Sequence, residues 1–275
     1  MDMQQRRARL EKAFFQRFSG GKIYPSYTDA AARCSRGLYE NTDILEIVKT
    51  KARQFRTDLN NGTPVNINIG VLSLTDAICR MAGRHPGKRL RIIDFGGGDG
   101  GYYLYARKLI PENISLQWQV VETEKMVAAM REFETAELSF SASLQEAAEK
   151  SAGNTDIIFT SCTLQYTPDP CQMLEALLDM KSSLILFNRQ SLSLENFDVI
   201  SIQASLLSWH GYGPPSTAGY RERVIRYPHT SIRQQKFEEM IGRNYHTLYT
   251  FDEPSGTRKA GRYRTIGKSY CCLRK

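Results

Sequence analysis

The chain has 275 residues, 41% of them hydrophobic and 24% charged, which is typical of a globular protein with one large domain and a full core. It contains no run of about 18 apolar residues and begins with a polar, charged segment, so we expect no membrane span, no signal sequence and a cytoplasmic location. The net charge of +8 is concentrated near the two ends, where aromatic residues are sparse, and this argues against a nucleic-acid partner.

The six cysteines show no pattern typical of a metal site. Four are scattered, two are adjacent, and neither a CxxC pair nor a Cys/His cluster with zinc spacing occurs. We therefore expect no metal, and thiols that are reduced and mostly buried.

The first third of the chain has a helical pattern. Apolar residues recur at helical spacing over residues 1–18, and a loop rich in glycine, proline and tyrosine follows. A second helix is expected from about Ala30 to Phe55, with a break near Gly37, and a third over residues 69–82. We interpret residues 1–85 as an N-terminal helical cap or lid segment.

From residue 90 onward, short apolar strands alternate with helices. Strands are expected over residues 90–94, 116–122, 138–140, 156–161 and 183–188, with a helix in each interval between them. This alternation predicts a parallel sheet with helices on both faces. We assign residues 86–275 to this domain.

The alternation of strands and helices ends after residue 190. An insertion over about 190–230, expected to contact substrate, holds a possible helix at 197–210 and a long loop, and a further helix is expected from Ser231. Residues 245–252 and 262–273 read as an antiparallel hairpin. The predicted fold is α/β: a Rossmann-like, doubly wound, mostly parallel seven-stranded sheet with a terminal antiparallel hairpin and the helical cap.

The turn after the first of these strands is the strongest functional signal. Asp94 closes the strand, and the turn that follows includes Gly96, Gly97 and Gly98. A strand, a glycine turn and a helix bring backbone N–H groups close to a nucleotide-like ligand. The turn also satisfies the dinucleotide fingerprint, but a carboxylate is unfavourable beside a pyrophosphate. It suits S-adenosylmethionine (SAM), which carries an ammonium and a sulfonium and no phosphate.

Glu122 supports a bound nucleoside. It closes the second strand, 24 residues after Gly98, where a carboxylate can accept hydrogen bonds from ribose hydroxyls. This position fits NAD and SAM equally well.

These motifs resemble those of class I SAM-dependent methyltransferases. Within that class, the segments IIDFGGGDGGYY, WQVVE, TSCTLQYTPDP and RYP, and the tyrosines before the second helix, are similar to a family of methyltransferases associated with polysaccharide and lipopolysaccharide biosynthesis. The motifs cover about residues 90–190.

The resemblance implies roles for further residues. Asp94, Gly96 and Gly98 would hold the methionine part of the cofactor and Glu122 the ribose. Phe140 and Ser141 would flank the adenine. The residues implied near the reacting end are Ser161, Cys162, Thr163 and Tyr166. A core position would explain Phe140 equally well, and Tyr166 could simply pack beneath its loop.

An oxygen acceptor can require a general base. His210 and His229 fall in the insertion and are the candidates, although a surface or capping role is as plausible for each. Arg189, Arg226 and Lys22 could bind an anionic or sugar-phosphate acceptor. Tyr24 and Tyr27 could close over the cofactor.

The sequence therefore predicts an enzyme that transfers a methyl group from SAM to a small-molecule or glycan acceptor, at a hydroxyl oxygen. The absence of an Asn-Pro-Pro-Tyr-like element after the fourth strand argues against methylation of an exocyclic base nitrogen. Two alternatives remain at this point: an NAD(P)-dependent oxidoreductase and a non-catalytic SAM-binding module.

Overall fold

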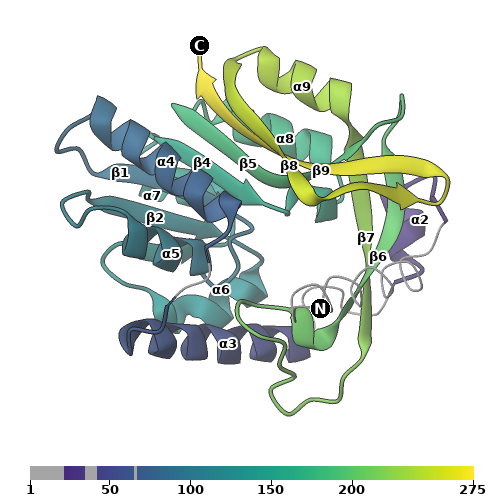
Figure 1. Cartoon of the computed structure of the whole chain (residues 1–275), viewed down its shortest axis with the longest axis horizontal. Coiled ribbons are helices and arrows are strands. Elements are labelled where there is room, and N and C mark those ends of the chain that lie inside the picture. The colour runs from purple at the N-terminus through teal and green to yellow at the C-terminus, as the bar shows by residue number, and fades with distance from the viewer. Residues whose placement is uncertain (1–21, 35–41, 65–66) are drawn as a thin grey trace.

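The protein is described from a computed structural model, which covers residues 22–34, 42–64 and 67–275 (Figure 1). The predicted helix over residues 1–18 lies outside these ranges. The helices are α2 (Tyr27–Ala31), α3 (Thr42–Asn60), α4 (Ile69–Arg84), α5 (Gly101–Leu109), α6 (Glu124–Met130), α7 (Leu144–Lys150), α8 (Pro170–Asp179) and α9 (Gln234–Gly242). The strands are β1 (Leu90–Phe95), β2 (Leu116–Val121), β3 (Leu138–Ser141), β4 (Ile157–Ser161), β5 (Leu184–Ser193), β6 (Val199–Leu206), β7 (Val224–Arg233), β8 (Tyr245–Ala260) and β9 (Tyr263–Arg274).

The first five strands form a parallel sheet in the order β3-β2-β1-β4-β5. β9 pairs antiparallel with β5, and β8 pairs antiparallel with β9, so the last two strands form the expected terminal hairpin. The order reverses between β1 and β4, which is where doubly wound sheets bind ligands, at the carboxyl ends of their strands. The α/β class, the mostly parallel sheet and the hairpin are thus confirmed.

Two strands were not expected. β6 and β7 form an antiparallel ribbon, and β7 joins the end of β5 through Leu192 and Ser193, so the described residues form a sheet of nine strands rather than seven. The predicted helix at 197–210 is wrong, because Val199–Leu206 is a strand, and the loop before residue 231 is largely β7. Val199, Ile200 and Ile202 are β-branched, and this preference was the signal for a strand.

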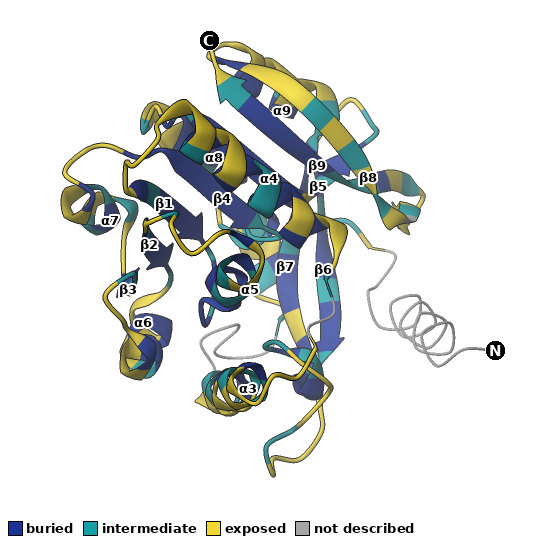
Figure 2. Ribbon diagram, turned by 60° about the vertical axis from the view of Figure 1, so that its left-hand side comes forward, coloured by how far each residue is buried: buried dark blue, intermediate teal, exposed yellow. Residues whose placement is uncertain are grey.

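Helices cover both faces of the sheet. One core lies beneath α3, α4, α5 and α6, and the other beneath α7, α8 and α9. The strands β1, β4 and β5 are almost entirely buried, whereas the helices keep exposed outer faces (Figure 2). The adjacent Cys271 and Cys272 enter opposite cores because successive strand residues point to opposite faces.

All six cysteines are free, but only Cys271 and Cys272 are buried. The expectation of mostly buried thiols is therefore wrong for the other four. Among the described residues, no helix combines the length and apolar character needed to cross a bilayer.

The described N-terminal helices are not all placed alike. Ile44 and Ile47 of α3 and Leu74 of α4 belong to the same core as Trp118 of the sheet. Residues around α2 lie instead on the β6–β7 ribbon, where Ile23 forms a β-bridge to Ser201. A separate cap over residues 1–85 remains a prediction.

Candidate functional site

The glycine turn follows β1 directly. Gly96 and Gly98 have left-handed φ values of 71° and 59°, a conformation that favours glycine. A Cβ on Gly96 would lie 2.7 Å from the Cβ of Thr163, so the turn packs tightly against the loop after β4. A Cβ on Gly98 would meet no atom within 4 Å, so the turn faces open space at that residue.

Asp94 lies beneath this turn rather than on its surface. Its side chain is fully buried, and its Oδ2 accepts a hydrogen bond from the indole N–H of Trp118 at 3.2 Å. Its Oδ1 has no hydrogen-bond partner among the described residues, and a Cβ on Gly97 would lie 2.7 Å from that atom. Burial raises the pKa of Asp94 to about 8.

Asp99 is a second buried acid in the turn, and sequence reasoning missed it. Only 1% of it is exposed; its Oδ1 accepts the N–H of Gly101 at 3.2 Å, and its Oδ2 lies 3.8 Å from the guanidinium of Arg56. Burial raises the pKa of Asp99 to about 6, although Arg56 lowers it. Its place between Gly98 and Gly100, just before a predicted helix, was the available signal.

Glu122 stands where the sequence placed it, at the end of β2. Its carboxylate accepts the N–H of Gly98 and the N–H of Thr123, both at 3.1 Å. Burial raises the pKa of Glu122, and these two bonds oppose the increase. The half-buried carboxylate thus lies directly beside the open part of the glycine turn.

Phe140 and Ser141, at the end of β3, point into the protein. Phe140 is 2% exposed and belongs to the core, the alternative that the sequence left open. Ser141 is fully buried; its hydroxyl donates to Gln119 and accepts from Lys150. Neither side chain presents a surface to a ligand in this conformation.

Polar side chains connect the ends of β4 and β5. The amide nitrogen of Asn188 donates to the hydroxyls of Ser161 (2.9 Å) and Tyr102 (3.2 Å). The side chain of Arg189 donates to the same Ser161 hydroxyl from both Nη2 (3.1 Å) and Nε (3.3 Å). Ser269 of β9 donates to the Asn188 amide oxygen at 3.1 Å and so fixes the direction of the amide.

Arg189 and Cys162 both have left-handed backbone angles, with φ of 55° and 59°. Asn188 and Arg189 form a β-bulge opposite Ser269, because Phe187 pairs with Tyr270 and Gln190 with Lys268. Bulges and strained residues are common beside functional sites, where they redirect side chains.

Tyr166 links the loop after β4 to the β6–β7 ribbon and to α2. Its hydroxyl donates to the side-chain oxygen of Gln203 at 3.1 Å and lies 3.7 Å from the Cys162 sulfur. Its backbone carbonyl accepts a hydrogen bond from the Tyr27 hydroxyl at 3.0 Å. Tyr27 therefore reaches the loop that was expected to line the reacting end. Tyr24 binds the same ribbon through its backbone N–H, which donates to the Ile200 carbonyl.

The two candidate histidines lie on either side of Tyr227. The ring of His229 packs edge-on against Tyr166, with centroids 5.6 Å apart, and this histidine is half-buried. His210 is 6% exposed, and its Nε2 is 3.0 Å from the hydroxyl of Ser205. Burial lowers the pKa of each to about 4, with further lowering by Arg258 for His229 and by Lys51 for His210.

Tyr212, in the segment after β6, is a site residue that the sequence analysis missed. A Cβ on Gly101 would lie 2.8 Å from the Cζ of its ring, so the ring lies directly on the start of α5. It also packs edge-on against Tyr102 at 5.7 Å and stacks with Phe55 at 6.0 Å. Its flanking glycines, Gly211 and Gly213, were the signal that this segment turns back on itself.

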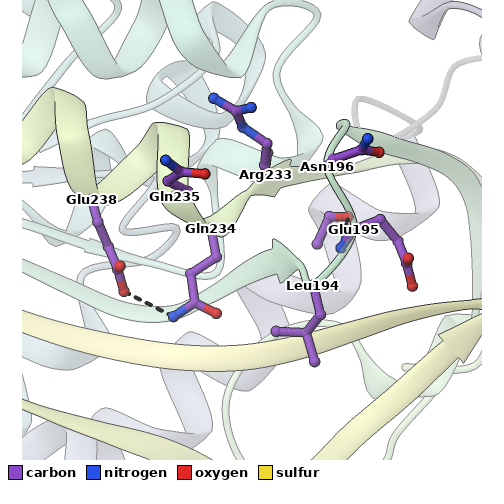
Figure 3. Close-up of a pocket in the computed structure, with 8 residues that line it drawn as sticks. Leu194, Glu195, Asn196, Arg233, Gln234, Gln235 and Glu238 are labelled. Atoms are coloured by element: carbon purple, nitrogen blue, oxygen red, sulfur yellow. Dashed lines mark hydrogen bonds between the residues drawn. The ribbon is translucent and has the colours of Figure 1, made fainter.

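A pocket of about 380 Å³ lies away from these residues. It is lined by the loop after β5, around Glu195, and by the start of α9, where Gln234 donates to Glu238 (Figure 3). None of the predicted site residues lines it. We define the strand-end site by the glycine turn (residues 96–98), Glu122, Ser161 and Arg189.

No protein-family model matches this sequence, and no curated protein matches it. Similar solved structures include a SAM-bound amino pentose methyltransferase from Micromonospora echinaspora involved in calicheamicin biosynthesis (12% identity, TM-score 0.45, 81% of this chain and 97% of that one). A SAM-dependent methyltransferase from Clostridium acetobutylicum is 9% identical (TM-score 0.44, 82% and 98% covered). The sugar N-methyltransferase KedS8 from Streptoalloteichus is 13% identical (TM-score 0.41, 72% and 85% covered). These neighbours are methyltransferases, the class that the motifs resemble.

Proposed function

We propose that this protein is a SAM-dependent methyltransferase and that the strand-end site holds the cofactor. The observation that carries the proposal is the acidity of the glycine turn. Two carboxylates, Asp94 and Asp99, are buried in it with one oxygen each that lacks a hydrogen-bond partner, and Glu122 lies beside it. Arg56 lies near Asp99, but no cation among the described residues is placed near Asp94, whose carboxyl group burial keeps protonated, so a bound cation would stabilise its ionised form and the turn favours a cationic ligand.

The residues present fit SAM at both ends. Glu122 and the open turn at Gly98 suit the ribose, and the acids suit the ammonium and sulfonium. A dinucleotide would instead place a pyrophosphate beside the carboxylates of Glu122 and Asp99, and repulsion between like charges opposes that arrangement. We therefore favour SAM over NAD(P).

When bound, SAM supplies a methyl group already activated by its sulfonium. The protein's part is to align the acceptor atom and to exclude water. Ser161, Asn188 and Arg189 would form a rigid wall of the site at the ends of β4 and β5, because the Ser161 hydroxyl and the Asn188 amide are both held by hydrogen bonds. Tyr27 and Tyr166 would connect that wall to the acceptor side.

We assign the acceptor side to the face of the β6–β7 ribbon that contacts Tyr166. Gln203 and Tyr227 are paired across the ribbon, and His229 follows on the same face. Aromatic rings beside an amide suit a small molecule or saccharide that has hydroxyl groups. Arg226 precedes Tyr227 in β7 and so points to the opposite face of the ribbon, which leaves the exposed Lys22 as the candidate for binding an anionic acceptor on this side.

His229 is our candidate for the general base. Its low pKa keeps the imidazole neutral near pH 7, so it can accept a proton, although it is a weak base in the absence of ligands. His210 is less suitable, because it is more deeply buried and its Nε2 already bonds to Ser205.

Methyl-labelled SAM tests this proposal directly. We expect label to pass from SAM to at least one member of a panel of saccharides and small hydroxylated compounds, with stoichiometric formation of S-adenosylhomocysteine (SAH). Binding of SAM without transfer to any acceptor in a broad panel would favour a non-catalytic binding module. Oxidation or reduction of a nicotinamide cofactor would contradict the proposal.

A further inference from the structure

Arg189 occupies an unusual position at the end of β5. The bulge opposite Ser269 gives it a left-handed backbone, and its own N–H donates to the Ser269 hydroxyl at 2.9 Å. Its guanidinium donates to Ser161 and interacts electrostatically with Glu253 of β8, yet the side chain remains exposed, so the N–H groups that do not bind Ser161 are available to a ligand. Such a strained conformation persists only where the surroundings impose it, and here they direct one cation into the strand-end site.

A continuous set of contacts runs from this cation to the acids of the glycine turn. The Ser161 hydroxyl, which Arg189 binds, is 3.0 Å from the Tyr102 hydroxyl. The Tyr102 ring packs against Tyr212, which in turn lies on Gly101. The Gly101 N–H donates to Asp99. A guanidinium and a buried carboxylate therefore stand at opposite ends of this set of contacts.

The electrostatics of Tyr212 agree with this arrangement. Burial is the main reason that the pKa of its hydroxyl lies well above the usual value, and Asp99 and Asp94 raise it further. Arg189 lowers the same pKa. The hydroxyl thus experiences the acids and the arginine together, as expected for a side chain located between them.

This geometry matches a zwitterion. We propose that Arg189 binds the α-carboxylate of the cofactor's amino-acid portion, while the acidic turn faces its α-ammonium and Tyr212 covers the space between them. The inference rests on the proposed function and adds to it a specific carboxylate-binding residue. A guanidinium is well suited to this role because its planar N–H groups can bind a carboxylate in a bidentate manner.

Tyr212 can cover the site because its segment turns sharply on both sides. Gly211 and Gly213 have φ values of 74° and 90°. Val48 of α3 also limits the space at the first of them, because a Cβ on Gly211 would lie 3.1 Å from the Cα of Val48. The ring is held by Phe55 and Tyr102 from two different helices. A ligand below it would be shielded from water, which strengthens both charge interactions.

Calorimetric titration with SAM and with decarboxylated SAM tests the inference, because the second compound keeps the sulfonium and the ammonium but lacks the carboxylate. Wild-type protein should bind SAM about 10- to 100-fold more tightly than the decarboxylated compound, the range of a charge-assisted hydrogen bond. Arg189→Gln should weaken SAM by a similar factor and leave the decarboxylated compound within about twofold. Arg189→Lys keeps the charge but loses the planar guanidinium, so its affinity for SAM should lie between those of the wild-type protein and Arg189→Gln.

Arg262→Gln is the matched control, since it removes an exposed arginine whose side chain contacts Tyr263. It should leave both affinities unchanged. Equal wild-type affinity for the two compounds would overturn the inference, and so would an Arg189→Gln variant that weakens both equally or neither. If the variant weakens the binding of neither compound, Arg189 would be assigned to binding the methyl acceptor instead. Failure of the wild-type protein to bind SAM at all would instead reject the proposed function.

Discussion

Gly70 of α4 and Asn188 of β5 are in direct contact: a Cβ on Gly70 would lie 2.7 Å from the amide oxygen of Asn188. The helix therefore approaches the strand end as closely as a glycine allows. Asn188 is 2% exposed and binds Ser161, Tyr102 and Ser269, so the position of α4 and the geometry of the site depend on each other.

The first prediction concerns this contact. Gly70→Ala should destabilise the protein by about 1–3 kcal/mol, because the added methyl group overpacks the interface. It should also weaken SAM binding, because displacement of the amide breaks its bonds to Ser161 and Ser269. Thermal unfolding and calorimetry measure the two effects. Gly83→Ala is the matched control in the same helix, since its Cβ would meet nothing within 4 Å. It should stabilise the helix by up to about 1 kcal/mol. Equal behaviour of the two variants would show that the contact has no consequence.

The second prediction concerns pH. The folded-state pKa of Asp94, about 8, lies above its unfolded value, so between about pH 4 and pH 8 the folded protein retains a proton that the unfolded chain has released. The contribution of this group to stability is therefore lost as the pH rises through that interval. A cationic ligand favours the ionised form, so SAM should bind more tightly as the pH rises from about 6 to about 8, with proton release.

Asp94→Asn should remove the part of both pH dependences that extends to about pH 8, while Asp99, with a pKa of about 6, keeps a slope of the same sign at lower pH. The difference in stability between wild type and this variant isolates the contribution of Asp94. His210 and His229 make stability increase between about pH 4 and pH 6.5, but they do so in both proteins and cancel in the difference. Calorimetry in buffers of different ionisation enthalpy detects the released proton. A parallel pH response of wild type and variant would rule out Asp94 as the source.

Much of the site was predictable because the carboxyl ends of parallel strands meet at one edge of a sheet. The glycine turn and Glu122 follow from that rule, whereas Ser161 was implied by the resemblance to methyltransferases. Side-chain direction does not follow from it: Phe140 and Ser141 end the right strand but point into the core. Asp94 likewise lies beneath the turn, where its side chain is fully buried rather than exposed to a ligand.

Contacts between distant segments could not be predicted from the sequence. The β6–β7 ribbon forms because two segments pair with each other and with β5, whereas the apolar spacing of residues 197–210 also fits a helix. Tyr212 lies on Gly101 only because the segment after β6 returns to α5. The β-bulge at Arg189 depends on pairing with Ser269, which no local pattern encodes.

The third prediction separates the two histidines. His229→Gln should reduce kcat by about 100-fold or more if this residue is the base, while the affinity for SAM stays unchanged. His210→Gln should act mainly on stability, because it disturbs the buried bond to Ser205. His246→Gln, at an exposed position of β8, is the control. Full activity of the His229 variant would remove it from the mechanism.

The fourth prediction concerns the N-terminal tyrosines. Replacing Tyr24 and Tyr27 together with alanine should weaken SAM binding, because the segment would lose its attachment to the loop after β4. Tyr27→Phe isolates the hydrogen bond to the Tyr166 carbonyl and should cost about 1 kcal/mol or less. An unchanged affinity in the double variant, measured by calorimetry, would show that these tyrosines do not close over the cofactor.

Calorimetric titration of the wild-type protein with SAM, SAH and NADH tests the central claim most directly. An acidic glycine turn with Glu122 beside it should bind SAM and SAH with one site per chain and should not bind NADH. Binding of NADH without SAM or SAH would contradict the account and identify the turn as a dinucleotide site.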